Sequence, residues 1–223
     1  GIYDSSTDTW SGPNFTPIGG QWPVNVNDPS TVLSTTFNGT FDGQGHTVKN
    51  IYFSRWQPNY KDCQSAGLIG RLGCHDNDPS ELRADNPTVR NVAVTGYIFG
   101  NRSIGGIVGK IGKTNHGGII ENCANFATVK NTDAKGVGGI VGAGWNGGII
   151  KNCYNAGNVS STYNCPTGGI SGSNEVDIVN CYNVGSIAAG INSFAMAIGT
   201  NNGGVFTVSN CYWLEGSAPG GGF

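Results

Sequence analysis

The stretch Ile150-Lys151-Asn152-Cys153 returns in closely similar form along this chain of 223 residues. Its Asn-Cys pair occurs four times, 28 to 30 residues apart, at Asn122-Cys123, Asn152-Cys153, Asn180-Cys181 and Asn210-Cys211. Self-similarity at a fixed period of this size indicates one supersecondary unit stacked on copies of itself. The repeat therefore decides the fold class, and equivalent positions should line up in rows along the stack.

Two earlier segments fit the same register without the cysteine, Val48-Lys49-Asn50-Ile51 and Val89-Arg90-Asn91-Val92. In this alignment apolar residues lie on both sides of the Asn, and both should face inward. We therefore expect the Asn to turn a corner in the left-handed conformation, which it tolerates better than other residues with a side chain. Stacked Asn side chains should also hydrogen-bond from one copy to the next.

Each copy continues with a short apolar strand between glycines. These strands are Gly67-Leu68-Ile69-Gly70, Gly106-Ile107-Val108-Gly109, Gly139-Ile140-Val141-Gly142 and Gly169-Ile170-Ser171-Gly172. We expect these glycines to supply corners with positive φ. A third apolar column consists of Ile98, Val129, Val159 and Ile187. About three short strands per copy predict an all-β fold, a right-handed parallel β-helix (solenoid) of about six coils spaced about 4.8 Å apart.

The Gly-Leu-Ile-Gly and Gly-Gly-Ile-Val-Gly units, alternating with Asn-Cys-Tyr-Asn, resemble the GLUG-motif repeats of bacterial secreted and cell-surface proteins. The resemblance covers roughly residues 37–213. It implies a right-handed β-helix of a kind shared by adhesins, enzyme accessory regions and stalks, some attached to IgA-specific metallopeptidases. No His-Glu-x-x-His motif occurs in the sequence, so we do not expect that peptidase activity in this chain.

The repeat divides the chain into three predicted parts. Residues 1–46 lack the repeat, and we expect an N-terminal cap and the strand that leads into the coils, since an uncovered strand edge invites association. Residues 47–215 should form the coils, with 28–31 residues in each regular coil and an insertion at 72–88 in the first. Residues 216–223 are a Gly-rich tail without a comparable cap. Either the native chain continues, or another molecule covers the last coil, and subunits then stack end to end.

Composition excludes several classes of function. Charged residues make up 12% of the chain and the formal net charge is −2, which argues against nucleic-acid binding. No run of 18 apolar residues occurs, so we expect no membrane span. Any signal peptide has been removed or lies outside this sequence. Together with the resemblance, these features predict a secreted or cell-surface bacterial protein.

Four of the seven cysteines fall in one inward column, where the earlier copies have Ile51 and Val92. We expect these thiols to act as small hydrophobic groups in a structural ladder. The two predicted ladders are Asn122, Asn152, Asn180, Asn210 and Cys123, Cys153, Cys181, Cys211. Parallel side chains on adjacent coils leave their Cβ atoms far apart for a disulfide. Cys63 and Cys74 flank a short loop and are the disulfide candidates.

Catalytic and metal-binding chemistry has little support. Carbohydrate-active β-helices need several carboxylates on one sheet, whereas the outward positions Lys49, Arg90, Glu121 and Lys151 offer only one. We therefore predict no enzymatic activity and no cofactor, with calcium as the one open case. The insertion carries an oxygen-rich cluster that could bind calcium or simply form turns. Its members are Asp76, Asp78, Glu81 and Asp85.

The residue after each cysteine should point outward, and three consecutive copies place a tyrosine there. The resulting candidate strip is Tyr154, Tyr182 and Tyr212, with Trp213 beside it. Such a strip could bind a glycan or a host or cell-surface protein. Stacked tyrosines also stabilise contacts between strands, which leaves a purely structural role open.

These observations predict a non-catalytic extracellular structural or adhesive surface module. Its rigid β-helix would present outward columns and loops for binding, and head-to-tail self-association is a further possibility. Two alternatives remain open: a carbohydrate-active β-helix enzyme or its accessory domain, and a subunit of a self-assembling extracellular filament.

Overall fold

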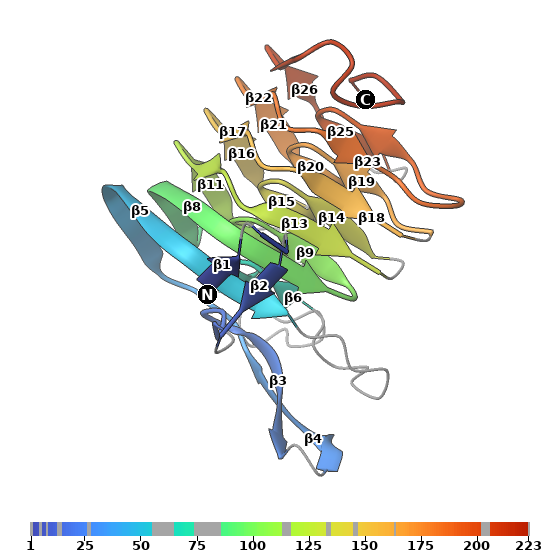
Figure 1. Ribbon diagram of the computed structural model, residues 1–223. Coiled ribbons are helices and arrows are strands. Elements are labelled where there is room, and N and C mark those ends of the chain that lie inside the picture. Colours follow the sequence, from blue (N-terminus) through green and yellow to red (C-terminus); the bar gives the residue numbers. More distant parts are fainter. Residues whose placement is uncertain are drawn as a thin grey trace.

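A computed structural model shows a stack of short β-strands with two hairpins beside it (Figure 1). The structure describes residues 2–4, 6–7, 9–12, 15–25, 28–54, 65–73, 86–112, 117–132, 135–144, 147–162, 164–201 and 206–222. Within these residues every regular element is a strand, and none is a helix. Three sheets of parallel strands run along the stack.

The largest sheet, which we call the long sheet, has 13 strands and contains the Asn-Cys segments. Its strands are β5 (Thr40–Ser54), β8 (Thr88–Gly100), β11 (Ile119–Glu121), β12 (Ala124–Asn125), β13 (Thr128–Asn131), β16 (Ile149–Lys151), β17 (Tyr154–Asn155), β18 (Val159–Ser161), β21 (Asp177–Val179), β22 (Tyr182–Asn183), β23 (Ile187–Ala188), β26 (Val208–Ser209) and β27 (Tyr212–Trp213). The chain crosses this sheet once in each coil.

The other two sheets have five strands each. The second sheet consists of β6 (Ser65–Ala66), β9 (Ser103–Gly105), β14 (Gly136–Gly138), β19 (Thr167–Gly168) and β24 (Ala195–Met196). The third consists of β7 (Ile69–Leu72), β10 (Val108–Ile111), β15 (Val141–Ala143), β20 (Ser171–Asn174) and β25 (Gly199–Asn201). Each strand pairs in parallel with its counterpart in the next coil, as Ile120 pairs with Ile150.

The predicted all-β parallel solenoid is confirmed. The structure shows about four complete turns, fewer than the six coils predicted. The difference arises at the two ends. In the first copy the connection between Ser54 and Ser65 lies outside the described residues, and the last copy contributes only β26, β27 and the tail.

Asparagine turns the corner of the long sheet in each coil after the first. The corner residues Asn91, Asn122, Asn152, Asn180 and Asn210 have φ between 51° and 54°, the left-handed region. Their side chains form a hydrogen-bonded ladder: the amide of Asn122 donates to Asn91 (3.1 Å), and that of Asn152 donates to Asn122 (3.2 Å). The amide of Asn180 continues the ladder to Asn152 at 3.2 Å.

The predicted alignment of the first copy is wrong. Phe41 rather than Val48 pairs with Val89, and His46 rather than Ile51 pairs with Val92. The cause is a longer corner in β5. Three residues separate Asp42 from His46, whereas only Asn91 separates their partners in β8, so the register shifts.

The long corner of β5 is made by Gln44 and Gly45, with φ of 53° and 79°. Asn50, which the alignment placed at this corner, lies at a second register shift further along β5. Of the two apolar residues aligned with the column of cysteines, Ile51 does not occupy it. Val92 does, and it is 3% exposed.

The glycines of the Gly-Ile-Val-Gly strands have a different purpose from the predicted one. None of those at the bracketing positions has positive φ. Instead, neighbouring chain segments approach them too closely for any side chain. A Cβ atom at Gly106 would lie 2.3 Å from the side-chain oxygen of Asn125, and one at Gly142 would lie 2.3 Å from the backbone nitrogen of Ile104.

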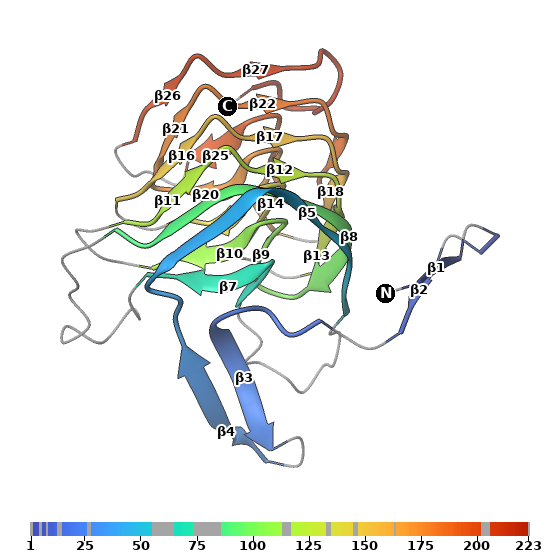
Figure 2. The same ribbon diagram turned by 90° about the vertical axis from the view of Figure 1, so that its left-hand side faces the viewer.

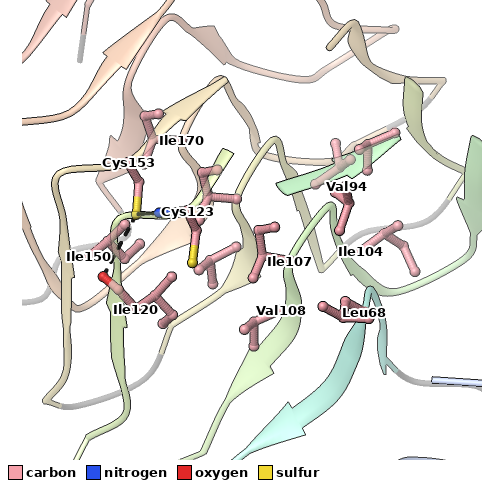
Figure 3. Packing of buried hydrophobic residues seen from close by; sticks show 14 of the residues in the cluster. Leu68, Val94, Ile104, Ile107, Val108, Ile120, Cys123, Ile150, Cys153 and Ile170 are labelled. Carbon is pink, nitrogen blue, oxygen red and sulfur yellow. Dashed lines mark hydrogen bonds between the residues drawn. The ribbon is translucent and has the colours of Figure 1, made fainter. Parts of the chain in front are cut away.

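The core between the sheets is mainly apolar. Figure 3 shows Cys123 and Cys153 among Ile107, Ile120 and Ile150, and each of these five side chains is at most 1% exposed. The columns predicted to face inward beyond the first copy do so, which buries branched apolar side chains over the whole length of the stack.

The segment before β5 only partly covers the first coil. Phe15, Ile18 and Phe37 lie against that coil; Ile18 pairs in parallel with Ile69, and Phe37 pairs with Leu72. The rest forms two antiparallel hairpins, β1 (Ile2–Asp4) with β2 (Thr9–Ser11) and β3 (Gly20–Asn25) with β4 (Asp28–Thr35). Both hairpins project away from the stack (Figure 2). The first long-sheet strand begins at Thr40, inside the segment 1–46 predicted as the cap and the strand that leads into the coils.

The Gly-rich tail that follows residue 215 pairs with the coil before it. Ile187, Ala197 and Ile198 donate backbone hydrogen bonds to the carbonyls of Ser217 (2.7 Å), Gly221 (2.6 Å) and Gly222 (2.8 Å). Ser217 is buried, and Ala218 packs against the core. The sequence signal was hidden because glycines replace the branched residues of the earlier coils.

Candidate functional site

The three tyrosines of the candidate strip lie in one column of the long sheet. Tyr154 pairs with Tyr182, and Tyr182 pairs with Tyr212. Their exposure rises towards the C-terminal end, since Tyr154 is half-buried while Tyr182 is 42% and Tyr212 is 70% exposed. The ring of Tyr154 contacts those of Tyr182 and Phe126, whereas Tyr212 has a strand neighbour on one side only among the described residues.

The geometry of the tyrosines limits what the strip can bind. The rings of Tyr154 and Tyr182 are parallel within 2°, with centroids 4.9 Å apart, and Phe126 meets Tyr154 edge-on at 5.5 Å. The facing surfaces of Tyr154 and Tyr182 are therefore covered by each other, and a sugar ring cannot stack between them. Burial is the main cause that raises the pKa of Tyr154, and the neighbouring Tyr182 raises it further. A stabilising ladder explains these contacts well.

A second outward column runs beside the tyrosines. It consists of Phe126, Ala156, Val184 and Leu214, which occupy equivalent positions in successive coils. Phe126 and Val184 are each 45% exposed and Leu214 is 56% exposed. The two columns together make an apolar band whose most exposed part lies over the last two coils.

Trp213 does not belong to the strip. It pairs with Asn183, whose side chain is buried in the core, so Trp213 occupies an inward position at the end of the stack. Its ring lies over Gly222, where an added Cβ atom would be 2.5 Å from the ring. No further coil follows among the described residues, and Trp213 is 43% exposed.

A buried asparagine ladder was missed by the sequence reasoning. Asn125, Asn155 and Asn183 are fully buried, and their side chains hydrogen-bond in series at 2.8 and 2.7 Å. Each side chain also holds the turn two residues further on, as Asn155 does with both backbone groups of Gly157. The signal was present in the sequence, because each of these residues stands two positions after a cysteine.

Another group of aromatic side chains lies at the opposite end of the long sheet. The rings of Tyr52 and Tyr97 stack at 6.3 Å, Tyr97 contacts Phe99 at 6.3 Å, and the ammonium group of Lys130 lies 5.9 Å from the Phe99 ring. Burial raises the pKa of Tyr97. The misaligned first copy concealed this group, since it placed Tyr52 in the Tyr154 column.

The outward charges of the long sheet are paired along one column. Asp42 occupies the position predicted for Lys49 and forms an ion pair with Arg90 at 2.9 Å. Glu121 forms an ion pair with Lys151 at 2.8 Å. The backbone N–H of Gln44, then the Asn91 amide and Arg90, lower the pKa of Asp42. Signs alternate from coil to coil, so the carboxylates are kept apart and each has a cationic neighbour.

The column cysteines are free thiols. Cys123, Cys153 and Cys181 are at most 1% exposed, and Cys211 at the end of the stack is half-buried. Their thiols donate to backbone carbonyls, as Cys153 does to Lys151 at 3.2 Å. Burial raises the pKa of Cys153, as do its contacts with the cysteines on either side. Cys165, outside this column, is also buried.

Several predicted residues lie outside the part of the chain that the structure describes. They are the disulfide candidates Cys63 and Cys74 and the calcium candidates Asp76, Asp78, Glu81 and Asp85. Among the described residues, no group of three or more His, Cys, Asp or Glu side chains could hold a metal ion.

Stacked parallel sheets, corner asparagines and paired outward columns define a parallel β-solenoid built from one repeated unit. The family described as "The GLUG motif" matches residues 133–160, and the predicted resemblance is confirmed over that repeat. Within the described ranges, no helix is long and apolar enough to cross a membrane.

Two known proteins are similar to this chain. Halomucin of Haloquadratum walsbyi is 29% identical over 127 residues, which cover 49% of this chain and only 1% of halomucin. The crystal structure of a "putative immunoglobulin A1 protease" from Bacteroides ovatus matches with a TM-score of 0.57 and 22% identity. That match covers 85% of this chain and 72% of the other and shows a common fold.

Proposed function

We propose that the chain is a non-catalytic, rigid module of a secreted or cell-surface bacterial protein, which spaces and displays binding surfaces. The observation that carries this proposal is that the polar groups repeated from coil to coil are used within the stack. The corner asparagines hydrogen-bond to one another, and so do the buried asparagines. The outward charged side chains form ion pairs along their column. The repeat thus supplies stiffness, and few of its polar side chains are left to bind or transform a substrate.

Rigidity follows from the density of these bonds. Every regular coil is tied to the next by backbone ladders in three sheets and by two asparagine ladders. A solenoid transmits force through such nearest-neighbour contacts. The similarity to halomucin and the GLUG match support an extracellular location, because the motif resembles repeats of secreted and surface proteins.

The non-catalytic assignment is tested against a panel of polysaccharides, with release of reducing ends and of unsaturated products as readouts. We expect neither. The alternative that this test addresses is a carbohydrate-active enzyme, which needs two carboxylates close together. Asp42 and Glu121 lie in one column two coils apart, a distance of about 10 Å. Activity that disappears in both Asp42→Asn and Glu121→Gln, while their thermal unfolding is unchanged, would establish the enzyme and reject the module.

The displayed surface is proposed to contact protein rather than glycan. Because the facing surfaces of Tyr154 and Tyr182 are occupied, the band offers ring edges together with Val184 and Leu214, a surface suited to apolar protein contacts. The test combines a glycan array with pull-down of surface proteins from host cells. We expect the triple variant Tyr154→Ser, Tyr182→Ser, Tyr212→Ser to lose protein retention. Glycan binding by the unmodified chain that the triple variant loses would contradict the assignment.

A further inference from the structure

Two outward columns of the long sheet, beyond the asparagine corners, combine aromatic and polar side chains. In one column Tyr97 is followed by Thr128 in the next coil, and in the other Phe99 is followed by Lys130. The coil after that adds an amide and a hydroxyl group at the same positions. We call these six residues the mixed face, and they are Tyr97, Phe99, Thr128, Lys130, Asn158 and Ser160.

The polar side chains of the mixed face are not used within the stack, in contrast to those of the two asparagine ladders. Asn158 is exposed, and Thr128, Ser160 and Lys130 are half-buried. Within the described part of the chain, none of these four side chains forms a hydrogen bond or an ion pair. The ammonium group of Lys130 lies 5.9 Å from the centroid of the Phe99 ring. Hydroxyl, amide and ammonium groups on one outward face are therefore available to a polar ligand.

The rings of the mixed face are packed less tightly than those of the candidate strip. Phe99 is tilted by 44° from Tyr97 at a centroid distance of 6.3 Å, whereas the strip has parallel rings 4.9 Å apart. The neighbours of Phe99 in its own column, Ser54 and Lys130, carry no ring. No aromatic neighbour in its column therefore covers a face of Phe99, and the C–H groups of a sugar ring can pack on it.

The charge around the mixed face is positive. Asn131, at the end of β13, donates from its side chain to the carbonyls of Arg102 and Gly136. Arg102 and Lys135, the residue before Gly136, therefore lie beside the strand that carries Lys130. No described residue forms an ion pair with any of these three cations, and the long-sheet strands carry no carboxylate after the corner. The surface therefore attracts a ligand with negative charge.

We propose that the mixed face binds an acidic glycan. A sugar ring packs on Phe99 and Tyr97, its hydroxyl groups bond to the amide and hydroxyl side chains, and its carboxylate or sulfate group pairs with Lys130. A single-stranded nucleic acid also combines rings with negative charge, but the formal net charge of −2 and the small number of cations disfavour it. The inference goes beyond the proposed function, because the mixed face is separate from the candidate strip and either surface can fail without the other.

The test is calorimetric titration of the whole chain with hyaluronan, which carries carboxylates, with dextran sulfate, which carries sulfates, and with neutral dextran. We expect binding to at least one acidic polymer, weakened by added salt, and no binding to dextran. The acidic polymer that binds more tightly shows whether a carboxylate or a sulfate is the group recognised. Absence of binding to both acidic polymers overturns the proposal. Equally tight binding of oligothymidylate also overturns it, because the surface would then belong to nucleic acid.

Two variants locate the site. Lys130→Gln should raise the dissociation constant about tenfold, and Phe99→Leu, which keeps an apolar side chain without the ring, should raise it about threefold or more. The matched controls are Tyr154→Leu and Lys151→Gln, which removes the same charge from an outward position before the corner. Both should bind like the unmodified chain, and circular dichroism checks that all four variants are folded. An equal loss in Lys130→Gln and Lys151→Gln would reduce the effect to general charge attraction and overturn the proposal.

The triple variant Tyr154→Ser, Tyr182→Ser, Tyr212→Ser separates this inference from the proposed function. It should lose protein retention while its affinity for the acidic polymer stays unchanged. Loss of the acidic polymer by this variant, with its circular dichroism unchanged, would place glycan binding on the candidate strip and refute the role of the mixed face.

Discussion

At the scale of single residues, the two asparagines of each Asn-Cys-x-Asn unit have distinct structural roles. The first, such as Asn152, is exposed and turns the corner with φ of 54°. The second, such as Asn155, is fully buried and spans neighbouring coils. The corner role could be predicted from the sequence because the left-handed conformation restricts residue type. The buried role could not, because alternation along a strand does not reveal what an inward polar side chain would meet.

The buried asparagines should dominate the stability of the stack. The Asn155 side chain makes four hydrogen bonds, two to Gly157 and one each to Asn125 and Asn183. Asn155→Ala leaves all these partners unsatisfied in the core, and we expect a loss of about 3 kcal/mol or more in the free energy of unfolding. Urea denaturation followed by circular dichroism measures it. The exposed Asn158→Ala is the control and should change stability by less than about 0.5 kcal/mol; similar losses in both would refute the ladder's importance.

The buried thiol of Cys153 predicts a loss of stability at alkaline pH. Unfolded cysteines release their protons above about pH 8.5, whereas burial raises the pKa of Cys153 in the folded chain. The contribution is therefore complete below that pH and is lost as the pH rises towards the raised pKa of the folded state. Urea midpoints at pH 7 and pH 10, under reducing conditions, measure the effect. Cys153→Val, which introduces the side chain that Val92 already places in the same column, should lose less between the two pH values, and an equal loss would contradict this cause.

At the scale of the strand, glycine sets how closely adjacent segments can approach. From the sequence we expected the glycines on both sides of the Ile-Val strands to form corners with positive φ. That role is wrong, because none of them has positive φ. The structure shows that they are needed where a neighbouring coil and the buried asparagines leave no room for a Cβ atom. That distance depends on tertiary packing, which a single sequence does not encode locally. The first-copy register failed for a related reason, since the extra residues of the β5 corner are visible only once its partner strand is known.

Close approach predicts a large effect of one added methyl group. In Gly139→Ala the Cβ atom would lie 2.2 Å from the Gly169 carbonyl oxygen and 2.3 Å from the Asn155 side chain. Because both neighbours belong to the ladders, we expect destabilisation of about 3 kcal/mol, at the upper end for overpacking. Thermal unfolding measures it. Gly39→Ala, whose nearest neighbour would be Phe37 at 3.6 Å, should be close to neutral, and comparable effects at the two sites would argue against a packing cause.

At the scale of the whole molecule, the repeat predicted the solenoid, the stacking direction and the inward columns of the later coils. The structure at the first and last described coils could not be predicted, because the residues there depart from the repeat. Phe15, Ile18 and Phe37 cover one end with residues outside the repeat, and glycines complete the other. The outward positions of Arg90, Glu121 and Lys151 were predicted, but the place of Asp42 beside Arg90 depended on the β5 register.

Removing the tail tests its place in the last coil. A chain ending at Gly216 lacks the carbonyl acceptors of Ile187, Ala197 and Ile198, so we expect faster amide hydrogen exchange at these residues. The equivalent amides of Val159, Gly169 and Ile170, which donate to Ser186, Met196 and Ile198, should be unaffected. Mass spectrometry of exchanged peptides distinguishes the two sets. Uniformly faster exchange would point to a global loss of stability and away from a local role.

The matched registers of the interior coils also make the length of the molecule adjustable. Ile120 meets Ile150 as Ile150 meets Ile178, so each interior coil presents the same surface above and below. Duplication or loss of one whole repeat would then alter reach in steps of about 4.8 Å without creating a new kind of contact. The number of repeats encoded in the gene would then set the length of the stack.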